Sequence, residues 1–324
     1  MKLTTIETTK AVGQVLCHDV TKIVPGEFKG RLFRKGHIIR EEDIELLLSA
    51  GKDVLYVWDD IEGMVHENDA ADRLQRLVRG SNISISEVKE GKINLISEVD
   101  GTLKINTDLL YKMNMIDEVI VATKPNHMYV KKGEVIAATR VIPLLIDEQK
   151  LITAEQLISE PIISVKPIEE CKIAMVTTGN EIYYGRIKDR FKEVIERKLE
   201  PFNTDFIGQT IVKDEIEDVK EAIQGYLDQE VDVIICTGGM SVDPSDITPS
   251  AIMETGSNIV TYGMPVLSGS MTLIAYNANS TILGLPAGVI FAEKTTLDLI
   301  LHRVLSKDPI TREEVAHYGN GGLL

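Results

Sequence analysis

The fold is decided by one stretch of the chain, Val231-Asp232-Val233-Ile234-Ile235-Cys236-Thr237-Gly238-Gly239-Met240-Ser241-Val242-Asp243-Pro244-Ser245-Asp246-Ile247-Thr248-Pro249. It opens with a short apolar run that ends at two glycines, which predicts a strand buried on both faces. A polar loop then leads to Asp246 and Thr248 at the start of a predicted helix. In open α/β sheets, ligands bind at the carboxyl ends of strands, and glycine turns let them approach the backbone. The loop is therefore either a binding site or an ordinary connection with a capping aspartate.

Composition limits the classes of protein to which the chain can belong. Its 324 residues carry a net charge of −15 and 44% of them are hydrophobic, which predicts a globular protein of two or three domains. This charge argues against a nucleic-acid surface, because phosphate neutralisation needs clustered Lys and Arg. No apolar run approaches the ~20 residues that span a bilayer, and the first residues lack a signal-peptide core. The three cysteines form no CxxC pair, which favours a reducing compartment. We therefore expect a cytoplasmic protein that binds neither nucleic acid nor membrane.

The first half of the chain predicts two small units without a catalytic motif. Residues 1–60 contain short strand-like pieces, one helix near 41–50 and a strand at 54–58. Residues 61–165 predict a second α/β unit, with an amphipathic helix over 66–79, short strands near 93–96, 119–122 and 135–138, and a linker that contains prolines.

From residue 171 to about residue 305 the pattern becomes regular. Strands at 172–177, 205–212 and 231–236 alternate with helices at 187–199 and 216–227. A strand at 258–261, a hairpin within 271–285 and a helix over 289–305 follow. This alternation predicts a doubly wound, mostly parallel α/β sheet. Residues 306–324 are predicted to be a loosely held tail.

Three predicted strand ends combine small residues with acids, and a fourth is rich in glycine. They are Thr178-Gly179-Asn180-Glu181, Lys213-Asp214-Glu215, Gly238-Gly239-Met240-Ser241 with Asp246 and Thr248, and Gly284-Leu285-Pro286-Ala287-Gly288. If the strands are parallel neighbours, all four loops lie along one edge of the sheet. Glycine loops offer backbone N–H groups to oxyanions, and the three acids Glu181, Asp214 and Asp246 suit Mg²⁺ binding or proton transfer.

Each acid also has a purely structural interpretation. Glu181 would then be a first-turn acid that complements the helix dipole, and Asp214 and Asp246 would be helix caps. The sequence contains no GxxxxGK[ST] motif and no GxGxxG after a strand, which argues against a P-loop and a dinucleotide site. The residues by themselves predict a polar, phosphorylated ligand with a metal and do not identify it.

In this order, the four segments resemble the molybdopterin-binding domain of molybdenum cofactor biosynthesis proteins. That family includes molybdopterin molybdenumtransferases (insertases), molybdopterin adenylyltransferases and gephyrin. The resemblance covers about residues 171–305, and the first half of the chain resembles that of some shorter bacterial molybdopterin-binding proteins. It implies binding of molybdopterin, a phosphorylated pterin dithiolene, together with Mg²⁺, and a homodimer. In insertases the substrates are adenylated molybdopterin and molybdate, and the products are molybdenum cofactor and AMP.

The resemblance also implies roles for individual residues. Asp246, Glu181 and Asp214 would be catalytic, and Asp246 and Glu181 would bind the metal. The pterin and its phosphate would contact residues of the loops, namely Thr178, Gly179, Gly238, Gly239, Met240, Ser241, Thr248, Gly284, Leu285, Pro286 and Ala287.

The sequence departs from the family pattern in several places. Asn180 stands where the family usually has Asp, and the loop at 284–289 lacks the usual Asn and second Pro. The usual N-terminal Ser-Ala-Met-Asp-Gly-Tyr-Ala run is absent, and the last predicted helix leaves too few residues for the usual C-terminal β-domain. Two functions follow: an insertase-type enzyme, or a non-catalytic carrier that delivers the cofactor to a molybdoenzyme. A phosphate-binding α/β domain with another ligand is a third possibility.

Overall fold

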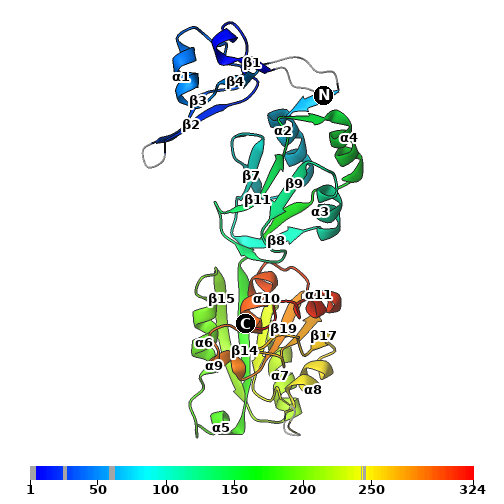
Figure 1. Cartoon of the computed structure of the whole chain (residues 1–324). Coiled ribbons are helices and arrows are strands. Elements are labelled where there is room, and N and C mark those ends of the chain that lie inside the picture. Colours follow the sequence, from blue (N-terminus) through cyan, green and yellow to red (C-terminus); the bar gives the residue numbers. More distant parts are fainter. Residues whose placement is uncertain (1–4, 25–27, 58–62, 242, 244–245) are drawn as a thin grey trace. The chain divides into compact units, whose positions relative to one another are not determined.

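The computed structural model describes residues 5–24, 28–57, 63–241, 243 and 246–324. The chain divides into two compact units (Figure 1). Unit 1 consists of residues 1–98, 104–126 and 133–164, and unit 2 consists of residues 99–103, 127–132 and 165–324. Unit 2 is therefore discontinuous, because it includes two short segments from the first half of the sequence.

The first part of unit 1 consists of short strands and one helix around a small apolar core. Strand β1 (Thr5–Glu7) pairs antiparallel with β4 (Val54–Tyr56), and β2 (Val20–Val24) with β3 (Phe28–Phe33). The 3₁₀ turn η1 (Thr8–Lys10) and helix α1 (Asp43–Ser49) complete this part, and α1 lies within the predicted helix at 41–50. The predicted strand at 54–58 ends at Trp58, which lies outside the described residues.

The second part of unit 1 is an antiparallel sheet with helices. The strand order is β6-β7-β11-β9, and the apolar face of α2 is completely buried through Ala70, Ala71, Leu74 and Val78. The elements are β5 (Met64–His66), α2 (Glu67–Val78), β6 (Ile83–Ile85), β7 (Lys92–Ser97), α3 (Thr107–Asn114), β9 (Val119–Thr123), β11 (Val135–Val141), β12 (Leu145–Asp147) and α4 (Glu148–Leu157). A separate three-stranded sheet has the order β10-β8-β13 and consists of β8 (Gly101–Ile105), β10 (Tyr129–Val130) and β13 (Ile163–Pro167). All of β10 and most residues of β8 and β13 belong to unit 2.

Unit 2 is built on a six-stranded sheet with the order β15-β14-β16-β19-β18-β17. Its strands are β14 (Cys171–Thr178), β15 (Thr204–Val212), β16 (Val233–Thr237), β17 (Asn258–Tyr262), β18 (Leu273–Asn277) and β19 (Ser280–Leu285). The first four strands in this order are parallel, whereas β18 and β17 are antiparallel to their neighbours. This arrangement confirms the predicted doubly wound, mostly parallel α/β fold.

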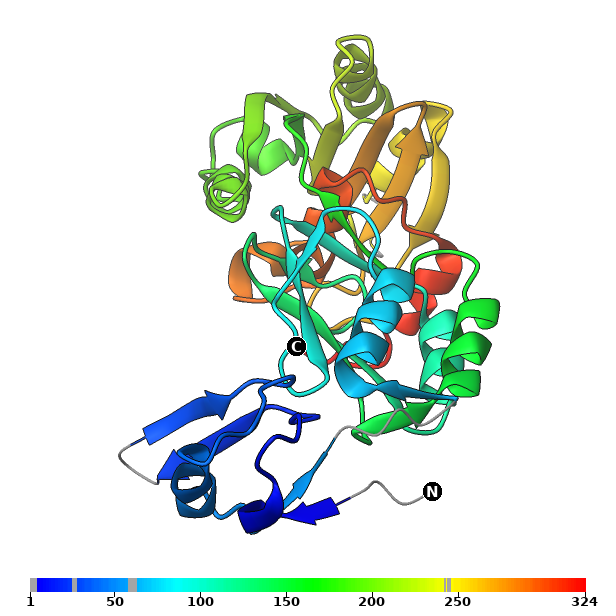
Figure 2. The ribbon, with the colours of Figure 1, turned by 90° about the horizontal axis from the view of Figure 1, so that it is seen from above.

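Helices cover both faces of this sheet, as the views in Figures 1 and 2 show. Because side chains alternate along a strand, β14 directs Ile173 and Met175 into one core and Ala174 and Val176 into the other. The first core includes α6 (Phe191–Leu199), α9 (Gly288–Phe291) and α10 (Thr296–Leu305), and the second includes α7 (Ile216–Leu227) and α8 (Thr248–Glu254). A one-turn helix, α5 (Asn180–Tyr183), follows β14 directly.

Two predicted helices of unit 2 have different bounds in the structure. The helix predicted over 289–305 is divided into α9 and α10, because Ala292 is extended and a capping box at Thr295 and Asp298 starts a new helix. The helix predicted over 187–199 begins only at Phe191, whose amide donates to Asp189 Oδ1 at 2.8 Å. Local capping groups therefore set both boundaries.

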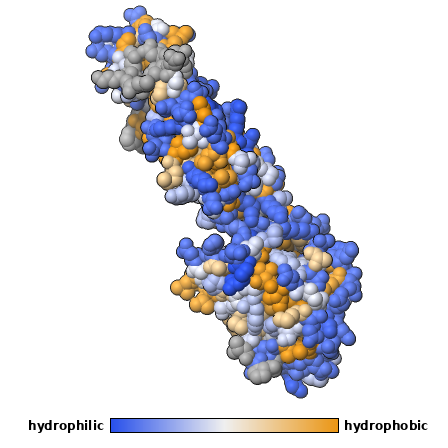
Figure 3. Space-filling view, turned by 90° about the vertical axis from the view of Figure 1, so that its right-hand side faces the viewer, coloured by the Kyte–Doolittle hydropathy of each residue, from blue (hydrophilic) through white to orange (hydrophobic). Residues whose placement is uncertain are grey.

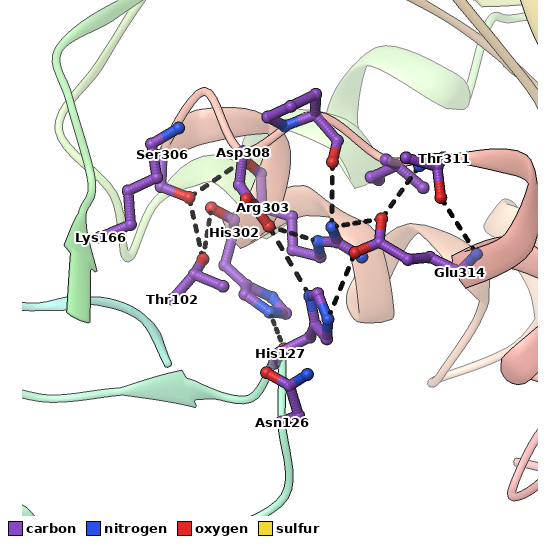
Figure 4. Close-up of polar contacts among 12 residues, drawn as sticks. Thr102, Asn126, His127, Lys166, His302, Arg303, Ser306, Asp308, Thr311 and Glu314 are labelled. Atoms are coloured by element: carbon purple, nitrogen blue, oxygen red, sulfur yellow. Dashed lines mark hydrogen bonds and ion pairs between the residues drawn. The ribbon is translucent and has the colours of Figure 1, made fainter. Parts of the chain in front are cut away.

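The C-terminal segment 306–324 is anchored, so the prediction of a loosely held tail is wrong. It forms α11 (Arg312–His317), and Val315 is completely buried. Arg303 of α10 is also completely buried, and it donates to Asp308 Oδ2 at 2.8 Å and to Glu314 Oε2 at 2.9 Å (Figure 4). A buried guanidinium requires partners of opposite charge, and here the segment itself provides them.

Three further observations concern the chain as a whole. Cys17, Cys171 and Cys236 are free and buried. Burial raises the pKa of the Cys171 thiol to about 11 and that of Cys236 to about 12, so both stay protonated at neutral pH. Among the described residues, no helix is both long enough and apolar enough to cross a membrane.

Candidate functional site

The register of the sheet places the four parallel strand ends side by side. Thr177 of β14 pairs with Thr237 of β16, and Thr237 pairs with Leu285 of β19. On the other side, Thr178 pairs with Val212 of β15. The chain leaves β14 toward β15 on one side and later returns to β16 on the other, so the order of strands reverses between β14 and β16. Ligands of open α/β sheets bind outside such a reversal.

The Gly238-Gly239 turn lies against the end of β14. Gly238 has φ +86°, and a Cβ atom at this position would lie 2.0 Å from the carbonyl oxygen of Thr178. Gly239 has φ +54°, and its Cβ would lie 2.9 Å from Thr248 Oγ1. Both positions require glycine, because a side chain would meet neighbouring atoms and the left-handed backbone disfavours other residues.

Thr248 holds this turn in place from the start of α8. Its hydroxyl donates to the carbonyl oxygen of Gly238 at 2.8 Å, and its amide donates to that of Gly239 at 3.2 Å. The side chain is buried, with 1% exposure, so its role is to position the turn. The structure thus shows Thr248 in contact with the turn, and its predicted contact with a ligand stays a prediction.

Three consecutive amides, starting at the second glycine of the turn, have no acceptor among the described residues. Within the part of the chain that the structure describes, the N–H groups of Gly239, Met240 and Ser241 donate no hydrogen bond. The side chain of Met240 is buried and covers Gly284, where a Cβ would lie 2.5 Å from Met240 Cε. Met240 can therefore contact a ligand only through its backbone. A row of unpaired amides in a glycine turn is a typical anion-binding arrangement.

Tyr262 supports the same loop and was not predicted from the sequence. Its hydroxyl donates to the carbonyl oxygen of Ser241 at 3.0 Å. Burial, and secondarily the negative charge of Asp246, raise the pKa of Tyr262, so the hydroxyl remains a donor at neutral pH. Tyr262 belongs to β17, at the far edge of the sheet, and no spacing in the sequence links it to the loop.

Asp214 fixes the first loop rather than capping the next helix. Its Oδ1 lies 2.8 Å from the hydroxyl of Thr178, and its Oδ2 accepts from the amide of Asn180 at 2.8 Å. The N-cap position of α7 is Glu215, which forms no side-chain cap. Both carboxylate oxygens are thus engaged within the protein, and the geometry gives Asp214 a positioning role.

Asp246 closes its own loop and keeps one oxygen available. Its Oδ2 accepts from the amide of Asp243 at 2.9 Å, and its amide donates to Asp243 O at 2.8 Å. The N-cap of α8 is Ile247, so Asp246 is not the helix cap. Its Oδ1 has no hydrogen-bond partner among the described residues.

Glu181 is exposed in the first turn of α5, as its structural interpretation predicted. It forms no ion pair with any described residue. In the same described part of the chain, no group of three or more His, Cys, Asp or Glu residues could hold a metal. Glu181 and Asp246 therefore do not build a metal cage by themselves, and a cation here would need oxygen atoms of a ligand.

The remaining predicted residues differ in accessibility. Leu285 is buried in the core, and Gly284 is covered by Met240. Pro286 is half-buried, and Ala287 is exposed at the start of α9. Gly179 has φ +149° and forms the N-cap of α5. In the loop at residues 284–288, only the backbone and the side chains of Pro286 and Ala287 are therefore open to a ligand.

A layer of buried polar contacts lies beneath the strand ends. The hydroxyls of Thr177 and Thr237 are 2.9 Å apart, and Gln209 Nε2 donates to Thr177 Oγ1 at 2.8 Å and to Asp189 Oδ2 at 2.7 Å. These contacts join β14, β15 and β16 below the turn. A separate open cavity of 790 Å³ is found near the starts of the strands, by Val231 and Thr281, and contains none of the predicted site residues.

Comparisons with known protein families match two segments of the chain. Residues 174–307 match the family described as "Probable molybdopterin binding domain", which confirms the resemblance found in the sequence. Residues 5–59 match a family described only as a domain of unknown function.

Curated relatives match a small part of the chain. A CinA-like protein of Petrotoga mobilis is 31% identical over 84 residues, which cover 26% of this chain and 21% of that protein. A CinA-like protein of Thermotoga neapolitana is 31% identical over 83 residues, which cover 26% of this chain and 20% of that protein. The match thus spans about a fifth of the length of these relatives.

Solved structures also resemble part of the chain. The protein CinA from Thermoplasma acidophilum has 16% identity and a TM-score of 0.38, covering 42% of this chain and 98% of that one. The tungsten cofactor synthesizing protein MoaB from Pyrococcus furiosus has 20% identity and a TM-score of 0.38, covering 46% of this chain and 98% of that one.

Proposed function

We propose that the loops at the carboxyl ends of β14, β16 and β19 bind molybdopterin, and that the protein acts in molybdenum cofactor biosynthesis or delivery. The observation that carries this proposal is the row of unpaired amides at Gly239, Met240 and Ser241, beside the reversal of strand order. Backbone amides bind a phosphate without a cationic side chain. This mode of binding suits a protein with a net charge of −15.

The residues around the loop would keep it ready for the ligand. Thr248 and Tyr262 fix the two ends of the turn, and Asp214 fixes the neighbouring loop at Thr178 and Asn180. A loop already held in its binding conformation loses little conformational entropy when a ligand arrives. The proposed binding loop is thus held by contacts within the protein, and two of the predicted site residues, Thr248 and Asp214, serve as its supports.

A second candidate function is insertion of molybdate into adenylated molybdopterin. The observation in its favour is that Asp246 Oδ1 has no hydrogen-bond partner among the described residues. Mg²⁺ is commonly held by one or two carboxylates together with substrate phosphates, and it neutralises charge on those phosphates. The available donors fit such a shared ion, with Asp246 as the protein carboxylate. Glu181 would serve as a second carboxylate only if the ligand extends to α5.

The experiment has two steps and uses the full chain. The protein is first incubated with molybdopterin, and retained pterin is measured after gel filtration. It is then incubated with adenylated molybdopterin, molybdate and Mg²⁺, and AMP is measured. Retention without AMP supports the carrier, and AMP release that is lost in Asp246→Asn supports the insertase. Asp205→Asn, an exposed aspartate of β15, is the matched control. A protein that retains neither compound would refute both functions.

A further inference from the structure

Two neighbouring tyrosines are exposed directly after the first predicted loop. Tyr183 is 45% exposed and Tyr184 is 57% exposed, and their ring centroids lie 5.2 Å apart with perpendicular planes. The face in Figure 3 shows that hydrophobic surface in this protein is confined to patches within a mostly hydrophilic surface. About half of each tyrosine is therefore open to solvent.

Backbone hydrogen bonds hold the two tyrosines at the end of β14. The amide of Tyr183 donates to Gly179 O at 2.8 Å, and the amide of Tyr184 donates to Asn180 O at 3.1 Å. Asn180 is held in turn by its amide bond to Asp214 Oδ2 at 2.8 Å. The tyrosines thus stand at the same strand end that contacts the Gly238 turn, and not on a separate loop.

Each ring is accompanied by a cation. Lys213 Nζ lies 5.6 Å from the centroid of Tyr183, and Arg186 Cζ lies 5.2 Å from the centroid of Tyr184. Neither cation forms an ion pair with a carboxylate among the described residues. Two such cations, each over one ring of a tyrosine pair, are unexpected in a protein with a net charge of −15. Aromatic faces bind planar rings, and Lys and Arg bind anionic groups.

We propose that Tyr183 and Tyr184 form a stacking shelf for a planar heteroaromatic ring that carries an anionic substituent. Lys213 and Arg186 attract the anionic substituent, one tyrosine ring stacks on the heterocycle, and the other ring, which is perpendicular to the first, contacts its edge. The assignment of this ring to the pterin of molybdopterin rests on the proposed function. In that assignment, the amide row at residues 239–241 binds the phosphate and the shelf binds the opposite, planar end of the ligand.

The probe for this proposal is pterin-6-carboxylate, a fluorescent planar heterocycle with one carboxylate. Its binding to the full chain is followed by fluorescence anisotropy. We expect Tyr183→Ala and Tyr184→Ala to weaken binding about 5- to 150-fold, the range typical when a residue that stacks on a base is reduced to alanine. Tyr183→Phe and Tyr184→Phe should bind within about twofold of the parent, because the ring face is retained.

Controls separate the shelf from general effects of exposed residues. Tyr111→Ala removes another exposed tyrosine, on α3 in unit 1, and should leave binding unchanged. Lys213→Gln should weaken pterin-6-carboxylate more than uncharged pterin. The parent and all variants are also analysed by sedimentation. A change of oligomeric state in Tyr183→Ala, with pterin binding unchanged, would overturn the proposal and identify the tyrosines as a protein–protein contact.

Other outcomes distinguish this proposal from the proposed function. If the parent does not bind pterin-6-carboxylate, or if the alanine variants bind it equally well, the shelf is refuted. If Tyr183→Ala retains molybdopterin as the parent does, the shelf is refuted while the proposed function stands. If the parent binds pterin-6-carboxylate through the tyrosines but never retains molybdopterin, the proposed function fails and the shelf stands.

Discussion

The most direct test of the candidate site is the substitution Gly238→Ala. A methyl group at this position would lie 2.0 Å from Thr178 O, whereas Cβ atoms essentially never approach another heavy atom within 3.0 Å. The turn and the end of β14 must therefore separate by at least about 1 Å. Such overpacking costs about 1–3 kcal/mol. The left-handed backbone at φ +86° adds about 1–2 kcal/mol for a residue with a Cβ.

Gly256→Ala is the matched control for this substitution. Gly256 also belongs to unit 2 and has φ +78°, but a Cβ there would have no neighbour within 4 Å. Gly256→Ala should therefore lower the free energy of unfolding only by the cost of the left-handed backbone, about 1–2 kcal/mol. The difference between the two variants isolates the contact with Thr178, which amounts to about 1–3 kcal/mol in the free energy of unfolding.

Thermal unfolding and pterin retention measure the two consequences. For a domain of 150–250 residues, 1 kcal/mol lowers the melting temperature by about 2–4 °C, so Gly238→Ala should melt roughly 2–12 °C below Gly256→Ala. Its amide row would also move beyond the ~0.5 Å that binding sites tolerate, so retention of molybdopterin should fall in Gly238→Ala alone. Equal melting temperatures of the two variants would refute the close approach of the turn to β14.

Three other predictions test the supports of the site and the C-terminal segment. Thr248→Val should lower the free energy of unfolding by about 1–3 kcal/mol because Gly238 O loses its donor, and Thr248→Ser should restore most of it; equal melting of the two would contradict this. Asp214→Asn should lower the melting temperature, because an amide nitrogen replaces one acceptor, while Asp246→Asn should leave it nearly unchanged; the opposite order would contradict the assigned roles. Burial opposes ionisation of Glu314, but the Thr311 amide and Arg303 lower its pKa below the ordinary 4.5. Its contribution to stability should therefore be complete above about pH 4.5 and be lost as the pH falls through the lowered pKa, and Glu314→Gln should flatten this acid limb in a series of melting curves.

The sequence predicted the sheet of unit 2 well, because buried parallel strands and amphipathic helices leave strong local patterns. The run at 231–236 and the hairpin across 277–280 are examples, since apolar continuity and turn residues define both within a few positions. The prediction that the four strand ends lie side by side followed from the alternation of strands and helices in the sequence. The position of the candidate site could therefore be predicted without knowledge of any contact.

The roles of individual residues could not be predicted in the same way. Asp214 contacts Thr178 across 36 positions of sequence, and Tyr262 contacts Ser241 from the far edge of the sheet. Such contacts depend on register and side-chain direction, which have no periodic signal in the sequence. The burial of Arg303 is a similar case. It lies in an apolar helix, and its partners Asp308 and Glu314 occur in a segment that composition alone indicates to be a tail.

Because unit 2 is discontinuous, residues 171–324 depend on contacts with earlier segments of the chain. The family match begins at residue 174, yet unit 2 also includes residues 99–103 and 127–132. Thr102 contacts Ser306 through their hydroxyls at 2.9 Å, and His302 Nε2 lies 2.7 Å from the carbonyl oxygen of His127. A gene fragment that encodes only residues 171–324 would lose both contacts. A transfer of residues 171–324 alone into another protein would therefore leave His302 and Ser306 without these partners.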